Sequence, residues 1–520
     1  MINYWWVTRP KRKLNTIPEV LATVSEATLN SVWAGERERH LMLEEALEKE
    51  GLKREGSRRD QTGGGARTYL AMLKSLGLMF EEKTTQRIYP TLAGEAILNG
   101  ANPVDILTQQ VLKYQFPSSF SISRGVRVSE RFRVHPFIFL LRLLRDDRIG
   151  DLSQEEIAKV VIVQAESNSD SCFEKVVKQI LAFRNEGDAS LEADFAIKYA
   201  PSKGGRYNDP FGHLYDVANT MINWLDYTRL ISREQSTVFI PGYKRDLVDE
   251  ILAIPPKLIE RPEEHEIFQR KYGLITGKKK DNRNLLETVM VTTNAIEEAR
   301  IKRAIIAESL KTPITSIDSS IVGTIENLTG CSSKIIEDTL YKMYKGGTSG
   351  ALDTFLTGYR EMAFSGRENA TEFETSTKEI MEKIFGYEAK HVGPIGLTPD
   401  VLVISDSEGY QGIFDNKAYA RYSITNDHHN RMVQNYIKGI SKYNGGCEHQ
   451  LAFFSYIAGG FKTTIDTQLA MVTSETSIPG SAITVDNFIH LIKAQQHNPK
   501  SHAELNHIFS IGREVRMVDL

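Results

Sequence analysis

The sequence predicts a multidomain α+β protein, with helix-and-hairpin units first, a helical segment in the middle and an α/β layer last. Three observations predict this organisation. The chain of 520 residues is too long to fold around one hydrophobic core. A helix followed by a short hairpin occurs twice in its first half. Towards the C-terminus, helical and strand-like patterns alternate, as they do in an α/β layer.

The first helix-and-hairpin unit is expected within residues 1–150. Apolar residues recur at helical spacing from Ala66 to Leu76, and Gly77 ends the helix. LMFEE, the turn TTQ and RIYPT then read as a short hairpin before another helix. This outline is typical of a winged helix, in which one helix lies in the DNA major groove and the hairpin lies on the backbone. A packed helical hairpin without any DNA contact explains the pattern equally well.

An arginine-rich segment leads into this predicted helix, with the sequence RRDQTGGGAR. Its glycines are first of all a flexible turn. Its arginines are candidate contacts to the phosphates or bases of DNA: Arg58, Arg59 and Arg67.

The second helix-and-hairpin unit is expected within residues 151–255. DLSQEEIAKVVI reads as a helix with Ser153 at its N-cap and Glu156 three residues later, which is a capping box. The later stretch DVANTMINWLDYTRLISREQSTVFIPGY repeats the order helix, strand, turn, strand. The sequence therefore predicts two winged-helix-like DNA-recognition domains in tandem.

The rest of the chain divides into a helical linker and a C-terminal α/β domain. Residues 256–366 are helical and polar and contain no catalytic constellation, so we expect a spacer. Residues 367–520 form the predicted α/β layer.

Composition excludes several classes of protein. No apolar run is long enough to cross a bilayer, and the N-terminal stretch MINYWWVTRPKRK has no signal-peptide pattern, so we expect a cytoplasmic protein. The cysteines, Cys172, Cys331 and Cys447, are scattered, which excludes a disulfide framework and the usual zinc ribbons.

The net charge of −3 hides local basic clusters. These are Arg9–Lys13, Lys53–Arg59, Arg124–Arg133 and Gly277–Arg283. Clusters of this kind suit a protein that binds a polyanion on one face, although any single cluster is explained as well by a solvated surface.

Two acids and a lysine stand at one end of a predicted hairpin. In TPDVLVISDSEGYQGIFDNKAY, Asp400 precedes the first strand-like run and Asp415 follows the second, with Lys417 two residues on. The ends of paired strands lie close together, so both carboxylates can share one hard cation such as Mg²⁺ or Mn²⁺. Lys417 would lie on the same face and could stabilise charge on a phosphate. Such a site suits phosphodiester hydrolysis, although the motif alone also arises by chance.

This order of residues resembles that of the PD-(D/E)xK nucleases. More narrowly, IMEKIFGYEAKHVGPIGLTPDVLVISDSEGYQGIFDNKAYARY is similar to the cleavage domain of FokI-type restriction endonucleases, over roughly residues 370–465. The FGY, KHVGP, PD and DNKAY segments carry the resemblance. The N-terminal two-thirds resemble the AlwI group and its nicking relatives, in the RPKRK start and in LKYQFPS and LAFRNE.

The resemblance implies roles for individual residues of the hairpin. Asp400 and Asp415 would hold a divalent metal, helped by the backbone carbonyl of Asn416, and Lys417 would be the catalytic lysine. Glu374 would be a supporting acid, with Glu379 as the competing choice.

The resemblance also implies contacts on the following helix. Gln434 would lie near the DNA backbone. Arg431 and Asn435 stand where relatives carry an acid–arginine pair that joins two cleavage domains, so the same dimer contact is in doubt. The sequence DHHN at 427–430 could suggest a different metal cluster, but adjacent histidines entering a helix are more often surface or capping residues.

The resemblance implies a prokaryotic, Mg²⁺-dependent type IIS restriction endonuclease, for which Mn²⁺ is expected to substitute. It would bind a short asymmetric sequence in double-stranded DNA and cut at a fixed distance outside it. A transient homodimer on DNA and a functionally linked DNA methyltransferase are the expected partners. A strand-specific nicking enzyme and a catalytically inactive DNA-binding regulator remain the alternatives.

Overall fold

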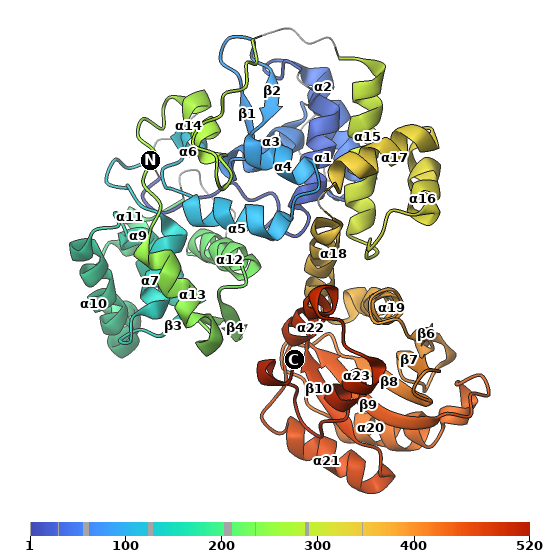
Figure 1. The fold of residues 1–520 in the computed structure, drawn as a ribbon. Coiled ribbons are helices and arrows are strands. Elements are labelled where there is room, and N and C mark those ends of the chain that lie inside the picture. The colour runs from blue at the N-terminus through green and yellow to red at the C-terminus, as the bar shows by residue number, and fades with distance from the viewer. Residues whose placement is uncertain are drawn as a thin grey trace. The chain divides into compact units, whose positions relative to one another are not determined.

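The structure, a computed structural model, describes residues 2–29, 31–55, 62–122, 128–201, 211–234, 236–286, 291–345 and 347–520. It divides into two compact units (Figure 1). Unit 1 comprises Met1–Ile306 and Asp318–Gly350, and unit 2 comprises Ala307–Ile317 and Ala351–Leu520. Both contain helices and strands, which confirms the α+β class. Within the described ranges, no helix has the length and apolar character needed to cross a membrane.

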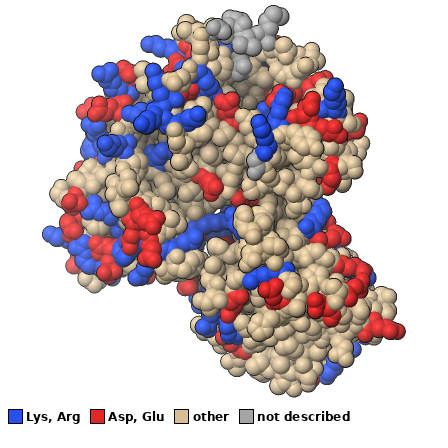
Figure 2. Space-filling view, in the orientation of Figure 1, with Lys and Arg blue, Asp and Glu red and all other residues tan. Residues whose placement is uncertain are grey.

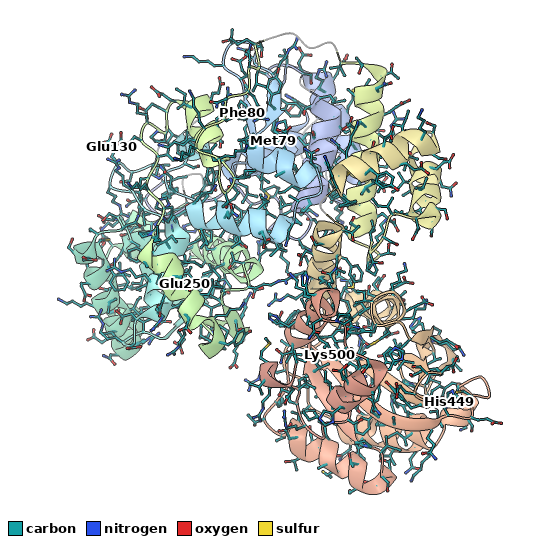
Figure 3. The ribbon with its side chains drawn as sticks, in the orientation of Figure 1. Met79, Phe80, Glu130, Glu250, His449 and Lys500 are labelled. Carbon is teal, nitrogen blue, oxygen red and sulfur yellow. The ribbon has the colours of Figure 1, made fainter. Side chains whose placement is uncertain are left out.

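Unit 1 begins with the predicted succession of helix, glycine, hairpin and helix. Helix α3 ends before Gly77, whose φ of +67° lies in the left-handed region that glycine adopts readily. Strands β1 and β2 pair antiparallel, and Met79 and Phe80 of β1 are buried (Figure 3). The elements are α1 (Ile17–Thr28), α2 (Arg37–Lys49), α3 (Gly64–Ser75), β1 (Met79–Glu81), β2 (Ile88–Pro90), α4 (Leu92–Leu98) and α5 (Pro103–Lys113).

The next part of unit 1 confirms the capping box and corrects the helix behind it. The Ser153 hydroxyl accepts from the backbone N–H of Glu156, and the Glu156 carboxylate accepts from that of Ser153. The segment predicted as one helix starts with a strand, however, and contains a π-helical turn. The elements are α6 (Ser119–Ile122), α7 (Pro136–Arg145), β3 (Asp151–Ser153), α8 (Gln154–Glu156), η1 (Ile157–Val161), α9 (Ile162–Gln164), α10 (Asp170–Glu186), η2 (Gly187–Ser190) and α11 (Phe195–Lys198).

The second predicted hairpin is also present in unit 1. Strands β4 and β5 pair antiparallel, and β3 adds to β5 on the other side. The elements are α12 (Gly212–Tyr227), β4 (Ser232–Glu234), β5 (Thr237–Phe239), η3 (Gly242–Lys244) and α13 (Arg245–Ala253).

The stretch predicted as a spacer is helical. Its helices are α14 (His265–Tyr272), α15 (Thr293–Ser309), α16 (Ser319–Thr329), α17 (Ser333–Met343) and α18 (Ser349–Met362). Helix α14 packs against β1, so this stretch contributes to unit 1.

Unit 2 is built on a five-stranded mixed sheet in the order β10-β9-β8-β7-β6. The strands are β6 (Glu388–His391), β7 (Val401–Ser405), β8 (Tyr410–Asn416), β9 (Gln450–Ala458) and β10 (Gly480–Thr484). The predicted hairpin is the antiparallel pair β7–β8, and β9 and β10 continue the sheet in parallel. The helices are η4 (Gly366–Asn369), α19 (Ala370–Lys383), η5 (Gly393–Ile395), α20 (Asn426–Asn430), η6 (Arg431–Ile437), η7 (Ile440–Lys442), α21 (Ile465–Thr476), α22 (Val485–His497), α23 (His502–Phe509) and η8 (Met517–Asp519).

The two faces of this sheet are covered by different helices. One face packs Val401, Val403 and Phe414 against α18, α19, α22 and α23. The other face packs Leu402 and Ile413 against η6 and α21. Because side chains alternate along a strand, the faces assign Asp400 and Asp415 to the side of Leu402 and Ile413.

Candidate active site

The β7–β8 register brings Asp400 and Asp415 together. Val401 pairs with Phe414, and one further step of the same register places Asp400 opposite Asp415. The backbone N–H of Asp400 donates to the carbonyl of Phe414 at 3.1 Å, one residue off this register, and the charge of Asp415 acts directly on Asp400. Residues directly opposite each other in an antiparallel pair have Cβ atoms about 5 Å apart on one face. The two carboxylates therefore share one end of the hairpin, as the sequence predicts.

Lys417 joins the two acids. Its Nζ lies 2.6 Å from Oδ2 of Asp415, and its backbone N–H donates to the carbonyl of Ile457 on β9 at 2.8 Å. Burial lowers the pKa of the Lys417 ammonium, but the charges of Asp415, Asp400 and Glu374 outweigh burial, so the pKa stands above its ordinary value. Lys417 is therefore a charged group held between carboxylates.

The carboxylate of Asp400 is fixed by the backbone of the opposite strand. Asn416 donates its backbone N–H to Oδ2 of Asp400 at 2.6 Å. Burial, followed by the negative charge of Asp415, raises the pKa of Asp400 well above its ordinary value. The raised pKa means that Asp400 resists a negative charge beside Asp415, so a bound cation would stabilise its ionised form.

The side chain of Asn416 points away from the acids and secures the strand to α19. Its Nδ2 donates to Oγ1 of Thr377 at 2.6 Å, and the Thr377 hydroxyl also contacts the Tyr359 hydroxyl at 2.7 Å. Asn416 and Thr377 are buried. The backbone of Asn416 thus belongs to the site while its side chain anchors the strand to the helix.

Glu374 reaches the site from α19 and contacts His391 there. Oε2 of Glu374 lies 2.8 Å from Nε2 of His391, the last residue of β6. A methyl group placed on Gly393 would meet Glu374 Oε2 at 3.1 Å, His391 Nε2 at 3.4 Å and Asp400 Oδ1 at 3.5 Å. These three side chains therefore converge on one point beside Gly393. His391 and Gly393 were not among the predicted site residues, although both lie in the KHVGP segment.

Other predicted residues lie elsewhere. Glu379, the alternative to Glu374, pairs with Lys383 at 2.7 Å and with Lys378 at 3.6 Å on the surface of α19. Gln434 is exposed on η6, where its Oε1 accepts from Lys438 at 3.5 Å.

The positions proposed for dimer contacts are also on η6. Arg431 is exposed and pairs with Asp427 at 2.9 Å, and Asn435 is half-buried.

The predicted DNA contacts in unit 1 are only partly visible. Arg67 donates to the backbone carbonyl of Thr62 at 2.5 Å and to its Oγ1 at 3.0 Å, at the start of α3. Arg58 and Arg59 lie outside the described residues.

The donor set at the hairpin fits a hard cation. Oδ1 of Asp415 is buried and has no hydrogen-bond partner among the described residues. Carboxylate oxygens are the ligands that Mg²⁺ prefers in proteins. Across the described ranges, no group of three or more His, Cys, Asp or Glu side chains is arranged to hold a metal, so a cation here would depend on two acids with backbone and water oxygens.

The histidines of DHHN do not form a metal cluster. Nδ1 of His428 contacts the hydroxyl of Tyr422 at 2.9 Å, and His429 contacts Glu475 at 2.8 Å. His449, just before β9, contacts Asp406 in the β7–β8 turn at 3.0 Å, at the far end of the hairpin from the acids (Figure 3). The described cysteines are all free thiols.

Residues 330–516 match the protein family described as FokI, cleavage domain. The matched range contains the whole Asp400–Asp415–Lys417 cluster together with Glu374 and His391. No curated protein matches the chain closely enough in sequence to count as a relative.

Solved structures of restriction endonucleases align with the chain at low similarity. The restriction endonuclease FokI is 15% identical with a TM-score of 0.29, covering 99% of this chain and 100% of that one. FokI bound to DNA is 14% identical with a TM-score of 0.28, covering 99% of each. The BpuJ1 endonuclease binding domain, in complex with modified DNA, is 15% identical with a TM-score of 0.38, covering 52% of this chain and 96% of that one. TM-scores this low support no conclusion about this chain. The similarity to restriction endonucleases is therefore judged from the family match of residues 330–516.

Proposed function

We propose that the protein is a DNA hydrolase of the type IIS restriction endonuclease class, because residues 330–516 match the FokI cleavage-domain family. The chain binds a short asymmetric sequence in double-stranded DNA through its N-terminal residues, up to about residue 255. It hydrolyses phosphodiester bonds at a fixed distance outside that sequence with residues 367–520. Residues 256–366 separate the two activities.

One observation carries this proposal. Asp400, Asp415 and Lys417 meet at one end of the β7–β8 hairpin inside the matched range, and a buried oxygen of Asp415 has no partner among the described residues. Because a buried carboxylate oxygen without a partner is costly, a cation bound at this end of the hairpin would stabilise Asp415.

The cofactor in this proposal is Mg²⁺, with Mn²⁺ as its substitute, held by Asp400, Asp415 and the carbonyl of Asn416. When bound, the ion supplies Lewis-acid stabilisation of the phosphate and activation of a water. Lys417 keeps its positive charge and stabilises the phosphate during transfer. Glu374, beside Asp400, orients a water or DNA oxygen together with His391.

The second part of the proposal concerns the residues that bind DNA. We assign residues 1–150 and 151–255 as two winged-helix-like domains, supported by the two helix-and-hairpin units. In this assignment Arg58, Arg59 and Arg67 contact DNA near the start of α3, and Gln434 contacts the backbone near the scissile bond.

A plasmid assay tests the proposal. The full chain is incubated with supercoiled plasmids of varied sequence and Mg²⁺, beside D415N, K417M and the matched control E379Q. Discrete linear fragments from the wild type and E379Q, with loss in D415N and K417M, would support the proposal. No cutting by the wild type on any plasmid, with DNA binding intact, would reject it in favour of a DNA-binding regulator.

The same assay separates the nicking alternative, which the residues on η6 favour. Arg431 is already paired with Asp427, and Asn435 carries no charge to pair with a second domain. Open circles without linear product would identify a nicking enzyme. Linear product would favour a transient homodimer on DNA. A DNA methyltransferase of the same specificity is the functional partner that either version requires.

A further inference from the structure

A loop of unit 1 presents three consecutive lysines to solvent. The lysine loop, defined here as residues 273–283, follows α14 and carries Lys278, Lys279 and Lys280, all exposed. With the residues that the structure describes, none of the three forms an ion pair. A run of charges in a mobile surface loop needs no explanation, but the two ends of this loop are firmly anchored.

The first anchor holds the start of the loop. Nζ of Lys113 donates to the carbonyls of Tyr272 at 2.9 Å and Leu274 at 2.7 Å. Tyr272 is buried, and its hydroxyl donates to the carbonyl of Gln110 at 2.9 Å. The carbonyl of Gly273 accepts from the N–H of Ala93 at 2.9 Å. The chain therefore enters the loop from a fixed position.

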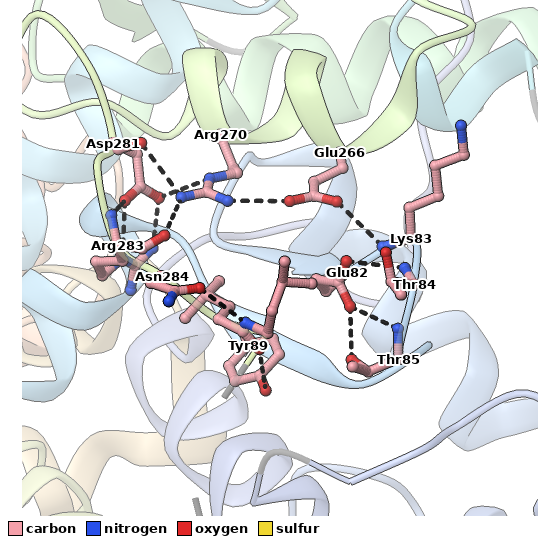
Figure 4. Close-up of polar contacts among 12 residues, drawn as sticks. Glu82, Lys83, Thr84, Thr85, Tyr89, Glu266, Arg270, Asp281, Arg283 and Asn284 are labelled. Atoms are coloured by element: carbon pink, nitrogen blue, oxygen red, sulfur yellow. Dashed lines mark hydrogen bonds and ion pairs between the residues drawn. The ribbon is translucent and has the colours of Figure 1, made fainter. Parts of the chain in front are cut away.

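The second anchor is a buried carboxylate at the end of the loop (Figure 4). Asp281, whose side chain is 1% exposed, contacts Nη2 of Arg283 at 2.7 Å and Nε of Arg270 at 3.3 Å. Arg270 also donates to the backbone carbonyl of Arg283 at 2.7 Å. Arg283 extends to Glu95 at 2.9 Å and to the carbonyl of Pro90 at 3.0 Å. These contacts of Asp281 with Arg270 and Arg283, called the clamp below, fix the position of the residue that follows Lys280.

The same network fixes the turn of the β1–β2 hairpin. Glu266 accepts from the backbone N–H of Lys83 at 3.0 Å and pairs with Arg270 at 3.0 Å. Glu82 closes the turn by accepting from the N–H groups of Thr84 and Thr85. The Lys83 side chain points away from these contacts (Figure 4). The hairpin turn and the lysine loop are therefore both held by α14.

Positive charge gathers on this part of unit 1. Figure 2 shows Lys and Arg side chains over the region of α14 and β1. The exposed lysines from these elements include Lys83, Lys271, Lys278, Lys279 and Lys280.

We propose that the lysine loop and the neighbouring hairpin turn form one preorganised surface that binds the phosphate backbone of double-stranded DNA, with Lys278, Lys279 and Lys280 as the principal contacts. The proposal rests on the proposed function and extends its DNA-binding part beyond residue 255, because α14 and the loop after it pack into unit 1. Lysines act on phosphates as point charges, so their contacts position the duplex without reading its sequence. Anchoring both ends of the loop lowers the ordering entropy lost on binding.

The test measures DNA binding against salt concentration. The full chain with D415N, which prevents cutting, is compared with the same chain carrying K278A/K279A/K280A. Plasmid-derived fragments of mixed sequence are the probe. Each phosphate contact contributes about 0.9 to the slope of log affinity against log salt concentration, so losing three should reduce the slope by about 2 to 3. In a second chain that keeps Asp415 and can therefore cut, K278A/K279A/K280A should cut DNA at the same positions as the wild type, but more slowly.

Two further variants complete the design. K311A/K334A/K345A removes three exposed lysines that lie outside the proposed DNA-recognition domains, and it should leave the slope unchanged. D281N weakens the clamp while keeping the lysines, so it should reduce affinity with little change in slope. An unchanged slope in the triple lysine variant, with wild-type binding and cutting intact, would overturn the loop assignment alone. Wild-type protein that neither binds nor cuts DNA would overturn the proposed function and the loop assignment with it.

Discussion

Gly393 offers a direct test of the candidate site, because a single methyl group there points into the convergence of Glu374, His391 and Asp400. The Cβ of G393A would lie 3.1 Å from Oε2 of Glu374, 3.4 Å from Nε2 of His391 and 3.5 Å from Oδ1 of Asp400. It meets no backbone atom among these nearest neighbours, and Gly393 does not have a positive φ. The backbone therefore tolerates alanine, and only the carboxylate of Glu374 has to move.

The size of the effect follows from that displacement. An ordinary contact of this kind is about 3.4 Å or longer, so Glu374 must shift by roughly 0.3 Å or rotate away. A misplacement of about 1 Å costs on the order of 100-fold in rate, so we expect G393A to reduce the cleavage rate about three- to tenfold. We expect the free energy of unfolding to change by less than about 1 kcal/mol, because no packed side chain is removed.

The assay is single-turnover plasmid cleavage at saturating enzyme and metal, with thermal unfolding measured on the same samples. G323A is the matched control, since a Cβ at Gly323 on α16 meets nothing within 4 Å. A G393A protein that cuts at the wild-type rate would refute the argument that these three side chains border the reacting groups. A large loss of stability would equally refute it, because the backbone was expected to accept the methyl group.

Three further outcomes can be checked. E374Q should reduce cleavage at least about tenfold while E379Q stays near wild type, since only Glu374 lies beside Asp400; equal losses in plasmid cleavage would contradict this. T377V should lower the free energy of unfolding of unit 2 by about 1–3 kcal/mol in urea titrations, because it leaves the buried Asn416 amide and Tyr359 hydroxyl without their shared partner. Burial lowers the pKa of Lys113 to about 8. The folded state releases that proton at a lower pH than the unfolded chain does, so the free energy of unfolding of unit 1 should rise by roughly 1–3 kcal/mol between about pH 8 and pH 10.5. K113Q should lack this rise. Parallel pH profiles of the wild type and K113Q would contradict the assignment.

The β7–β8 hairpin with its two acids could be predicted, because the residues that indicate it are close together in the sequence. Asp400 and Asp415 bracket two apolar runs separated by a turn, and strand pairing then fixes their proximity. The helix-and-hairpin outlines of unit 1 were predictable for the same reason, since Gly77 and short turns mark them. The Ser153–Glu156 capping box is a local pattern as well, and the structure contains it.

What could not be predicted depends on contacts between distant segments. The pairing of β3 with β5 joins residues more than 80 positions apart, and nothing near Asp151 announces it. Helix α21 gives little signal in the sequence, because IDTQLAMVTSET is rich in threonine and has weak helical periodicity. His391 was missed because its importance arises from Glu374, 17 residues away on α19.

The place of β9 in the sheet determines when the acid–lysine cluster can form during synthesis of the chain. Lys417 is hydrogen-bonded through its backbone to Ile457, and β8 is flanked by β9 along its length. A chain still emerging from the ribosome, or one ended prematurely before residue 450, already contains every acid and the lysine, yet it lacks the strand that aligns them. A parallel pair also needs a long crossover connection between its strands, here residues 417–449. During synthesis, the cluster therefore reaches this geometry only after β9 has been made.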